Sequence, residues 1–138
     1  MNDDEFQQSI AALDVLRAQI DSAVKQSQFL QISLEEMFRT RATFTTLAGS
    51  KEGDEILAPV GMSSFIRAKV TDSKLVVVGI GNKVSVDMGA EDAAEYMSSN
   101  IEKTSEVIKK LSCAIEEMDG KARTLAAVIQ QEYQKRQQ

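Results

Sequence analysis

The sequence predicts an α+β protein in which two long helices flank a short β-rich insert. Residues 6–48 and 91–136 each repeat apolar residues at helical spacing, whereas residues 53–89 change to strand and turn sequence. Aromatic residues make up only 5% of the chain and tryptophan is missing, which is typical of a coiled coil rather than of a thick globular core. We therefore expect a long antiparallel α-helical coiled-coil hairpin with two β-hairpins inserted between its helices. The expected parts of this single domain, 1–138, are a first helical segment at 1–50, the hairpins at 53–89 and a second helical segment at 91–138.

The first helical segment carries apolar residues that are alternately three and four positions apart. Nine of 11 positions in this seam are apolar, and Phe6 extends it by one heptad toward the N-terminus. Such a heptad pattern indicates a helix that supercoils around a partner helix. The seam residues are Leu13, Leu16, Ile20, Ala23, Ser27, Leu30, Leu34, Met37, Arg41, Phe44 and Ala48.

The insert contains four short strand-like segments separated by turn residues. Gly61-Met62-Ser63 and Gly81-Asn82 suit tight hairpin turns, and Pro59 removes a ladder donor, so its strand should lie at an edge or be bent. The third segment is apolar on both faces, and a small four-stranded sheet would leave it partly uncovered, so we expect burial against another subunit. The expected strands are 56–60, 64–70, 75–80 and 84–88. The residues that we expect in this subunit contact are Ile66, Ala68, Val70, Val76, Val78, Ile80, Val84 and Val86.

The second helical segment repeats the heptad pattern, and Thr104 is its one polar seam position. Gly120 costs about 1 kcal/mol relative to alanine in a helix interior. It either permits a close approach or a bend, or is a tolerated surface glycine. Antiparallel pairing would place Leu13 near Leu125 and bring the two chain ends together. The seam residues are Ala94, Met97, Ile101, Thr104, Ile108, Leu111, Ile115, Met118, Ala122, Leu125 and Ile129.

Apolar residues also gather near both chain ends, where no β body exists to cover them. One interpretation is an exposed hydrophobic tip that holds an unfolded or flexible protein. The alternative is a pair of frayed helix ends with incidental apolar residues. The candidate tip residues are Phe6, Ile10, Leu13, Leu125, Val128, Ile129 and Tyr133.

Composition argues against several other classes of protein. The net charge is −5 with no basic block, which disfavours a nucleic-acid partner, and no apolar run approaches the ~20 residues of a membrane span. The chain has no histidine and one cysteine, Cys113, so we expect neither a zinc site nor a thiolate–imidazole pair. The acidic N-terminus lacks a signal-peptide pattern, which favours a cytoplasmic protein.

Two further motifs are better explained by structure than by catalysis. Gly79-Ile80-Gly81 lacks the third glycine and the following helix of a dinucleotide-binding loop, so we interpret it as part of a hairpin. Glu35-Glu36, Glu91-Asp92 and Glu116-Glu117 lie on helices beside basic residues and indicate solvated faces. We expect a binding or assembly protein with no cofactor or metal, rather than an enzyme.

The order helix, two hairpins, helix resembles the α-type subunit of prefoldin over nearly the whole chain. The most specific matches are 56–61 (ILAPVG), 64–68 (SFIRA) and 76–81 (VVVGIG). Met62 and Ser63 depart from the family, whose members often carry small glycine-rich residues there.

This resemblance implies an archaeal-type subunit of a hexamer that contains two α-type and four β-type prefoldin subunits. Their inserts would form a β-barrel platform from which six coiled coils extend. The tips would capture non-native client proteins without ATP and pass them to a group II chaperonin, with no nucleic acid or membrane involved. The alternative is a prefoldin-like structural subunit that forms filaments through its β body.

Overall fold

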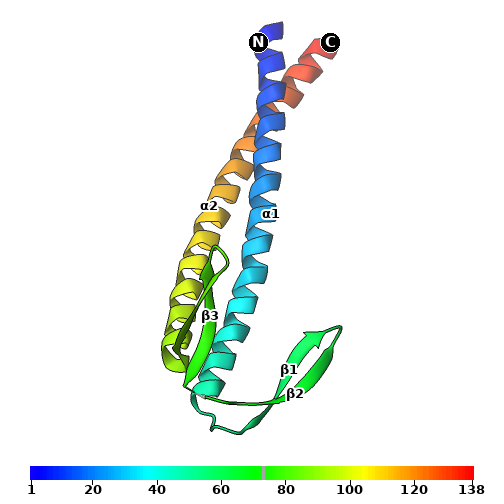
Figure 1. Cartoon of the computed structure of the whole chain (residues 1–138). Coiled ribbons are helices and arrows are strands. Elements are labelled where there is room, and N and C mark those ends of the chain that lie inside the picture. Colours follow the sequence, from blue (N-terminus) through cyan, green and yellow to red (C-terminus); the bar gives the residue numbers. More distant parts are fainter. Residues whose placement is uncertain (73) are drawn as a thin grey trace. The chain divides into compact units, whose positions relative to one another are not determined.

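In a computed structural model of the chain, two long helices flank two β-hairpins (Figure 1). The structure describes residues 1–72 and 74–138, so the turn expected between the strands at 64–70 and 75–80 lies partly outside the described residues. The predicted fold class is therefore confirmed, and each strand boundary falls within one residue of its expected position. The elements are α1 (Asp3–Ala48), β1 (Glu55–Gly61), β2 (Ser64–Lys69), β3 (Leu75–Gly81), β4 (Val84–Gly89) and α2 (Ala90–Gln137).

Helix α1 begins three residues earlier than the apolar pattern indicated because a capping box stabilises its first turn. The Glu5 amide donates to Asn2 Oδ1 at 2.8 Å, and the Asn2 amide donates to Glu5 Oε2 at 3.4 Å. These reciprocal bonds satisfy two donors that a helix start leaves without intrahelical partners. The acidic residues of this first turn also interact favourably with the helix dipole.

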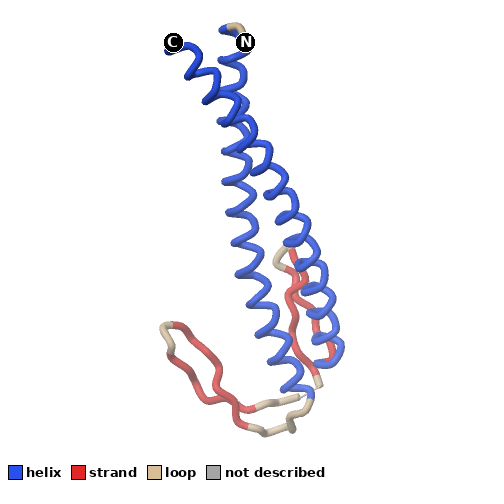
Figure 2. The backbone as a smooth tube through the Cα atoms, turned by 180° about the vertical axis from the view of Figure 1, so that it is seen from behind, coloured by secondary structure: helices blue, strands red, loops and turns tan. Residues whose placement is uncertain are grey.

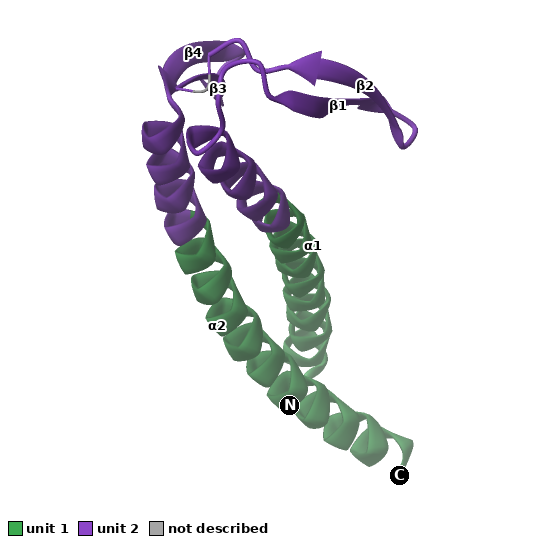
Figure 3. Ribbon diagram, turned by 90° about the horizontal axis from the view of Figure 1, so that it is seen from below, with its two compact units in different colours: residues 1–33, 104–138 green, residues 34–103 purple. Residues whose placement is uncertain are grey.

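The described residues form two compact units, which Figure 3 shows in different colours. Unit 1 contains residues 1–33 and 104–138, and unit 2 contains residues 34–103. In unit 1, the first part of α1 and the last part of α2 run antiparallel, and both chain ends lie at the same end of the unit (Figure 2). Among the best-buried side chains of unit 1 are Phe6, Leu13, Ser27 and Ala122.

The predicted seams are confirmed in both units. Every one of the 22 predicted seam residues is buried or half-buried, whereas the residues between them are mostly exposed. Burial therefore follows the heptad period, as expected when the helices of a pair cover each other along one stripe. The described helices contain no segment that is both long and apolar enough to cross a membrane.

Unit 2 contains both hairpins, and each forms its own two-stranded antiparallel sheet. Our expectation of one four-stranded sheet was wrong for the single chain. In the first hairpin, Ile56 pairs with Ala68 and Ala58 with Ile66. In the second hairpin, Val78 pairs with Val86.

The two hairpins turn through residues with positive φ, as tight hairpin connections require. Met62 and Ser63 have φ of 49° and 57° in the first turn, and Asn82 and Lys83 have 49° and 61° in the second. Asparagine tolerates this conformation, but methionine does not favour it. The first turn therefore holds an unfavourable backbone conformation at a bulky side chain.

The second hairpin is covered on one face by its own chain. Val78 is only 3% exposed, and Val76, Val86 and Met88 on the same face are half-buried. Two strands cannot bury a side chain this completely, and the hairpin lies beside the first turns of α2 in Figures 1 and 2. Other parts of unit 2 therefore supply the cover that a second sheet would supply in a larger protein.

Candidate functional sites at the tip and the hairpins

The tip of unit 1 is a cluster of side chains from both chain ends, centred on Arg136. The Arg136 guanidinium carbon lies 4.5 Å from the centre of the Phe6 ring. Its Nη1 forms an ion pair with Asp3, its Nε donates to Glu132 Oε1 at 3.2 Å, and its Nη2 donates to the Met1 carbonyl oxygen at 3.2 Å. We call these five residues the tip cluster.

Arginine side chains stay protonated in proteins, and the neighbours of Arg136 favour its charged form further. The hydrogen bond to Asp3 raises the pKa of Arg136 above its ordinary value, and the hydrogen bond to Glu132 adds to this effect. Desolvation acts in the opposite direction but is outweighed. The cation over the Phe6 ring is therefore permanent at any pH at which a protein functions.

The tip residues predicted from sequence fall into three groups by exposure. Val128 and Tyr133 are exposed, and Ile10, Leu125 and Ile129 are half-buried. Phe6 and Leu13 are buried, as their seam positions predict, so neither side chain offers its surface to a client in this structure. Their heptad positions turn both residues toward α2, and Arg136 covers Phe6 from the outside. The alternative of frayed ends does not fit the capping box on α1 or the four partners of Arg136.

Gly120 opens a shallow apolar groove on α2, within unit 1. No atom lies within 4 Å of the position that a Cβ would occupy, so the glycine does not permit a close approach to another element. It fits the alternative of a tolerated surface glycine. The groove has a volume of about 430 Å³ and combines apolar side chains with charged neighbours. Its lining residues are Glu116, Glu117, Gly120, Lys121, Thr124, Leu125 and Val128.

The first hairpin exposes apolar side chains on both of its faces. Leu57 and Phe65 lie on one face, and Ile56 and Ile66 lie on the other. All four are more than one-third exposed, and Met62 at the turn is 98% exposed. A two-stranded hairpin with so little cover is marginal by itself. This hairpin therefore has the properties of a surface that another chain covers.

The residues predicted for subunit contact are divided by the structure. Ile66, Ile80 and Val84 are exposed, and Ala68, Val76 and Val86 are half-buried. Val70 and Val78 are buried within the chain itself, so their availability for a subunit contact was wrongly predicted. Val78 is covered on the face that lies beside α2, and the Val70 amide bonds the Asp54 carbonyl oxygen at the base of the first hairpin.

The residues predicted for subunit contact leave out several exposed apolar side chains of the hairpins. In the first hairpin, the prediction followed the alternation of Ile66 and Ala68 with charged neighbours, which marks one face only. The signal for the other face was that Ile56-Leu57 and Phe65-Ile66 are adjacent apolar pairs, because adjacent strand residues point to opposite faces. The exposed apolar residues outside the predicted set include Leu57, Val60, Met62, Phe65, Leu75 and Val77.

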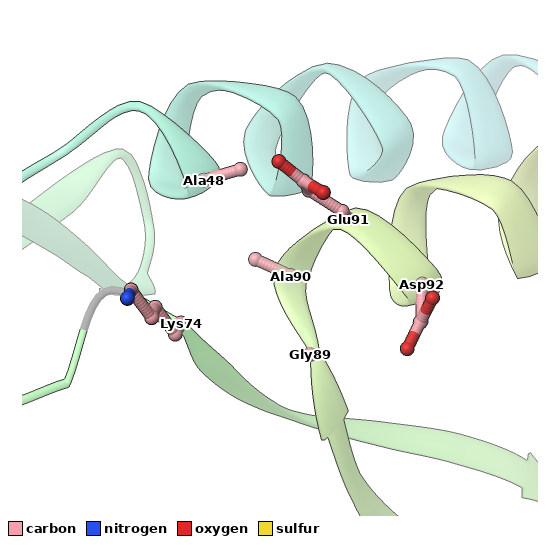
Figure 4. A pocket seen from close by; sticks show the side chains of 6 residues that line it. All are labelled: Ala48, Lys74, Gly89, Ala90, Glu91 and Asp92. Carbon is pink, nitrogen blue, oxygen red and sulfur yellow. The ribbon is translucent and has the colours of Figure 1, made fainter.

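A cavity of about 370 Å³ lies in unit 2 at the start of α2 (Figure 4). Lys74 lines it together with Glu91 and Asp92, and the Lys74 carbonyl oxygen accepts a hydrogen bond from the Ala90 amide at 2.8 Å. The two carboxylates belong to the first turn of α2, where the helix dipole favours them. The cavity is thus explained by the junction between β3 and the helix, and we assign no ligand to it.

Chemical groups suited to catalysis are not gathered at any of these sites. Across residues 1–72 and 74–138, no group of three histidine, cysteine, aspartate or glutamate side chains could hold a metal. Cys113 is a free, exposed thiol that lies outside the seam of α2. The sites can offer apolar contact area and exposed charge, which suit protein binding.

Two long helices that pair along heptad seams, joined through hairpins with uncovered apolar faces, define the class of the protein as a coiled-coil hairpin with inserted β-hairpins. The family model described as "Prefoldin subunit" matches residues 16–135. The chain belongs to the prefoldin family, a family of co-chaperones for protein folding, and its relatives identify it as an α-type subunit.

Similar proteins are found among archaeal prefoldins. Prefoldin subunit alpha of Methanothrix thermoacetophila is 30% identical over 110 residues, which cover 80% of this chain and 72% of that protein. Prefoldin subunit alpha 2 of Methanocaldococcus jannaschii is 30% identical over 122 residues, which cover 88% and 78%. The cryo-EM structure of filamentous PFD from Methanocaldococcus jannaschii has a TM-score of 0.70 at 27% identity, covering 88% of this chain and 98% of that chain.

Proposed function

We propose that this chain is the α-type subunit of a prefoldin hexamer, in which two α-type subunits join four β-type subunits through their hairpins. The coiled-coil tips capture non-native proteins and deliver them to a group II chaperonin without ATP. The observation that carries the proposal is the exposure of apolar side chains on both faces of the β1–β2 hairpin. Membership of the prefoldin family, whose subunits assemble with one another, supports it.

The hairpin surface supports assembly through simple burial. Exposed apolar area contributes about 25 cal/mol per Å² when it is removed from water, so several large side chains together provide a substantial driving force. Leu57, Phe65 and Val77 are among the most exposed of these residues. Assembly would cover them and complete the hydrogen bonding of strand edges that the single chain leaves open.

The tip supports client capture through a few apolar contacts on each chain. Val128 and Tyr133 are exposed, and Ile10, Leu125 and Ile129 can contribute part of their surface. Such small surfaces bind weakly when they act singly. Several tips in one assembly raise the apparent affinity through effective concentration, which suits a protein that must release its client.

Filament formation is the second candidate function. It is favoured by the similarity to filamentous PFD, whose structure this chain matches over 88% of its length. In that case the same exposed hairpins would join copies of this chain rather than β-type partners. The two functions require the same fold. They differ only in whether the exposed hairpins contact β-type subunits or further copies of this chain.

Native mass spectrometry of the chain, alone and mixed with a β-type subunit, tests these proposals. A discrete hexamer that forms only in the mixture supports the first function. Long polymers of this chain alone support the second and contradict the first. Aggregation of a chemically unfolded protein, followed by light scattering, then tests capture by the hexamer, because a hexamer that leaves aggregation unchanged does not act as a holding chaperone.

Replacing Val128 and Tyr133 together by serine tests the tip directly. Both side chains are exposed, so the double variant should assemble normally but suppress client aggregation less well. Val15→Ser is the matched control, because Val15 is also an exposed apolar residue of α1 within unit 1 but lies outside the tip. Equal suppression by the double variant and the control contradicts the tip assignment. Delivery to a chaperonin and a cytoplasmic location stay predictions.

A further inference from the structure

Phe6 is buried although it lies in the first turns of α1, close to the end of the chain. Its side chain is only 8% exposed, and the Arg136 guanidinium covers it on the outside at 4.5 Å from the ring centre. The Arg136 side chain itself is 32% exposed, so it faces solvent on its other side. A charged side chain therefore lies between one face of a large aromatic ring and water.

Arg136 is held over the ring from three directions. Asp3 pairs with Nη1, Glu132 accepts from Nε at 3.2 Å, and the Met1 carbonyl oxygen accepts from Nη2 at 3.2 Å. The planar guanidinium can satisfy these acceptors along its edge while its face rests on the ring. The orientation of the cover is thus set by charges on both helices of unit 1.

We propose that Arg136 is a latch that keeps Phe6 covered at rest, and that its release exposes Phe6 as a further contact for apolar side chains of unfolded proteins. This inference rests on the proposed function of the tip, and it adds a way in which the apolar surface of the tip is regulated. The ligand class follows from the chemistry of the covered group. A phenyl ring that is uncovered offers apolar area and a π face, which suit the aliphatic and aromatic side chains of an unfolded protein.

The latch is suited to reversible opening because each of its contacts is weak. Asp3 is almost fully exposed, and exposed ion pairs are screened by salt. A client that binds only the open form has an apparent affinity that is reduced in proportion to the fraction of molecules in which the latch is open. Removing the latch should therefore tighten client binding by about two- to tenfold.

The competing explanation is that Arg136 only joins the two helix ends. In that case its removal would leave client binding unchanged or weaken it by disordering the tip. The two explanations differ in the sign of the effect, and this difference makes the test decisive.

The first measurement reports the cover itself and does not depend on any client. The chain has no tryptophan, so Phe6→Trp in the full-length protein provides a single fluorescent reporter. Quenching of this fluorescence by acrylamide should be low with Arg136 present and should increase severalfold in the Phe6→Trp/Arg136→Gln variant. Raising the salt concentration to about 0.5 M should increase quenching only where Arg136 is present.

The second measurement reports capture by the full-length chain assembled with a β-type subunit. The probe is reduced and carboxymethylated lactalbumin, a permanently unfolded protein, and its affinity is measured by fluorescence anisotropy. Arg136→Gln should bind the probe about two- to tenfold more tightly than the unsubstituted chain, and Phe6→Ser/Arg136→Gln should lose this gain. Arg123→Gln is the matched control, because it removes another exposed arginine ion pair from α2, to Asp119 at 2.7 Å, far along the helix from Phe6.

Two results would overturn the latch. One is unchanged quenching in Arg136→Gln, and the other is increased quenching without tighter binding in an assembly that does bind the probe. Failure of the proposed function looks different, because then no assembly, including the unsubstituted one, binds the probe. That result contradicts a role of the latch in client capture. The tryptophan reporter still shows whether Arg136 covers position 6.

Discussion

Arg41 of α1 donates a hydrogen bond from Nη1 to Ser98 Oγ of α2 at 3.2 Å, within unit 2. In unit 1, Asp3 of α1 pairs with Arg136 of α2. Asp3 and Arg41 are 38 positions apart in the sequence, and so are Ser98 and Arg136. The two helices are therefore paired in the same register at both polar contacts, which agrees with the predicted approach of Leu13 to Leu125.

Replacing Arg41 by alanine should lower the free energy of unfolding by about 1 kcal/mol. The variant loses the bond to Ser98 and the stacking of the guanidinium on Phe38, whose ring centre is 5.1 Å away. Urea unfolding followed by circular dichroism measures the effect. Arg39→Ala is the matched control because Arg39 is exposed and lies outside the seam. An equal decrease in the free energy of unfolding of the two variants would show that the contact between Arg41 and Ser98 does not contribute to stability.

Met62→Gly should stabilise the isolated chain by about 0.5–1 kcal/mol and yet weaken assembly with a β-type subunit. Glycine adopts the φ of 49° without the steric penalty that methionine incurs. The same change removes a side chain that is 98% exposed and available to a partner. Thermal unfolding and sedimentation velocity measure the two effects. Ser63→Gly relieves a similar φ but removes little apolar area, so it should leave assembly intact; a loss of assembly there would assign the effect to the turn backbone.

Phe65→Ser and Val78→Ser should affect different properties, although both lie in the hairpins. Phe65 is exposed, so its loss should change the stability of the single chain by less than about 0.5 kcal/mol while preventing assembly. Val78 is buried in the chain, so serine there should destabilise it by about 2 kcal/mol. Chemical unfolding of the single chain and native mass spectrometry of the mixture separate the two outcomes. Strong destabilisation by Phe65→Ser would argue against a surface reserved for a partner.

Gly120→Ala should stabilise α2 by about 0.5–1 kcal/mol because alanine restricts the unfolded chain and meets no neighbour in the folded one. A rise in melting temperature measures this effect. Because the added methyl group enters the groove beside Leu125 and Val128, the client affinity of the same variant tests whether the groove takes part in capture. A fall in stability would instead indicate that the glycine accommodates a bend.

Both helices, their seams and all four strands could be predicted because these features depend on residues close together in the sequence. The alternation of Val84 and Val86 with polar neighbours defines a strand, and the spacing of Leu13, Leu16 and Ile20 defines a helix face, without knowledge of any distant residue. The start of α1 was missed by three residues because the apolar pattern begins at Phe6, whereas the cap is formed by Asn2 and Glu5.

The candidate sites were predicted less completely because the exposure of a residue depends on which distant segments of the chain pack against it. Phe6 has the sequence context of an exposed tip residue, and only the return of α2 places Arg136 over it, 130 positions later in the sequence. Val78 and Val77 are neighbours with the same side chain, yet one is buried and the other is 68% exposed, since only one face of β3 is covered by the rest of the chain.

The sequence by itself determined the class of fold, the heptad register of the two helices, the positions of both hairpins and the membership of the prefoldin family. Local periodicity and turn chemistry are sufficient for the fold class, the register and the hairpins, because each residue needs only its near neighbours to form them. The family membership rests instead on the similarity of the sequence to prefoldin subunits. The tertiary structure alone decided which apolar residues remain open to a partner and that Arg136 covers Phe6. Those properties arise when segments far apart in the chain come into contact, and local sequence patterns do not predict such contacts.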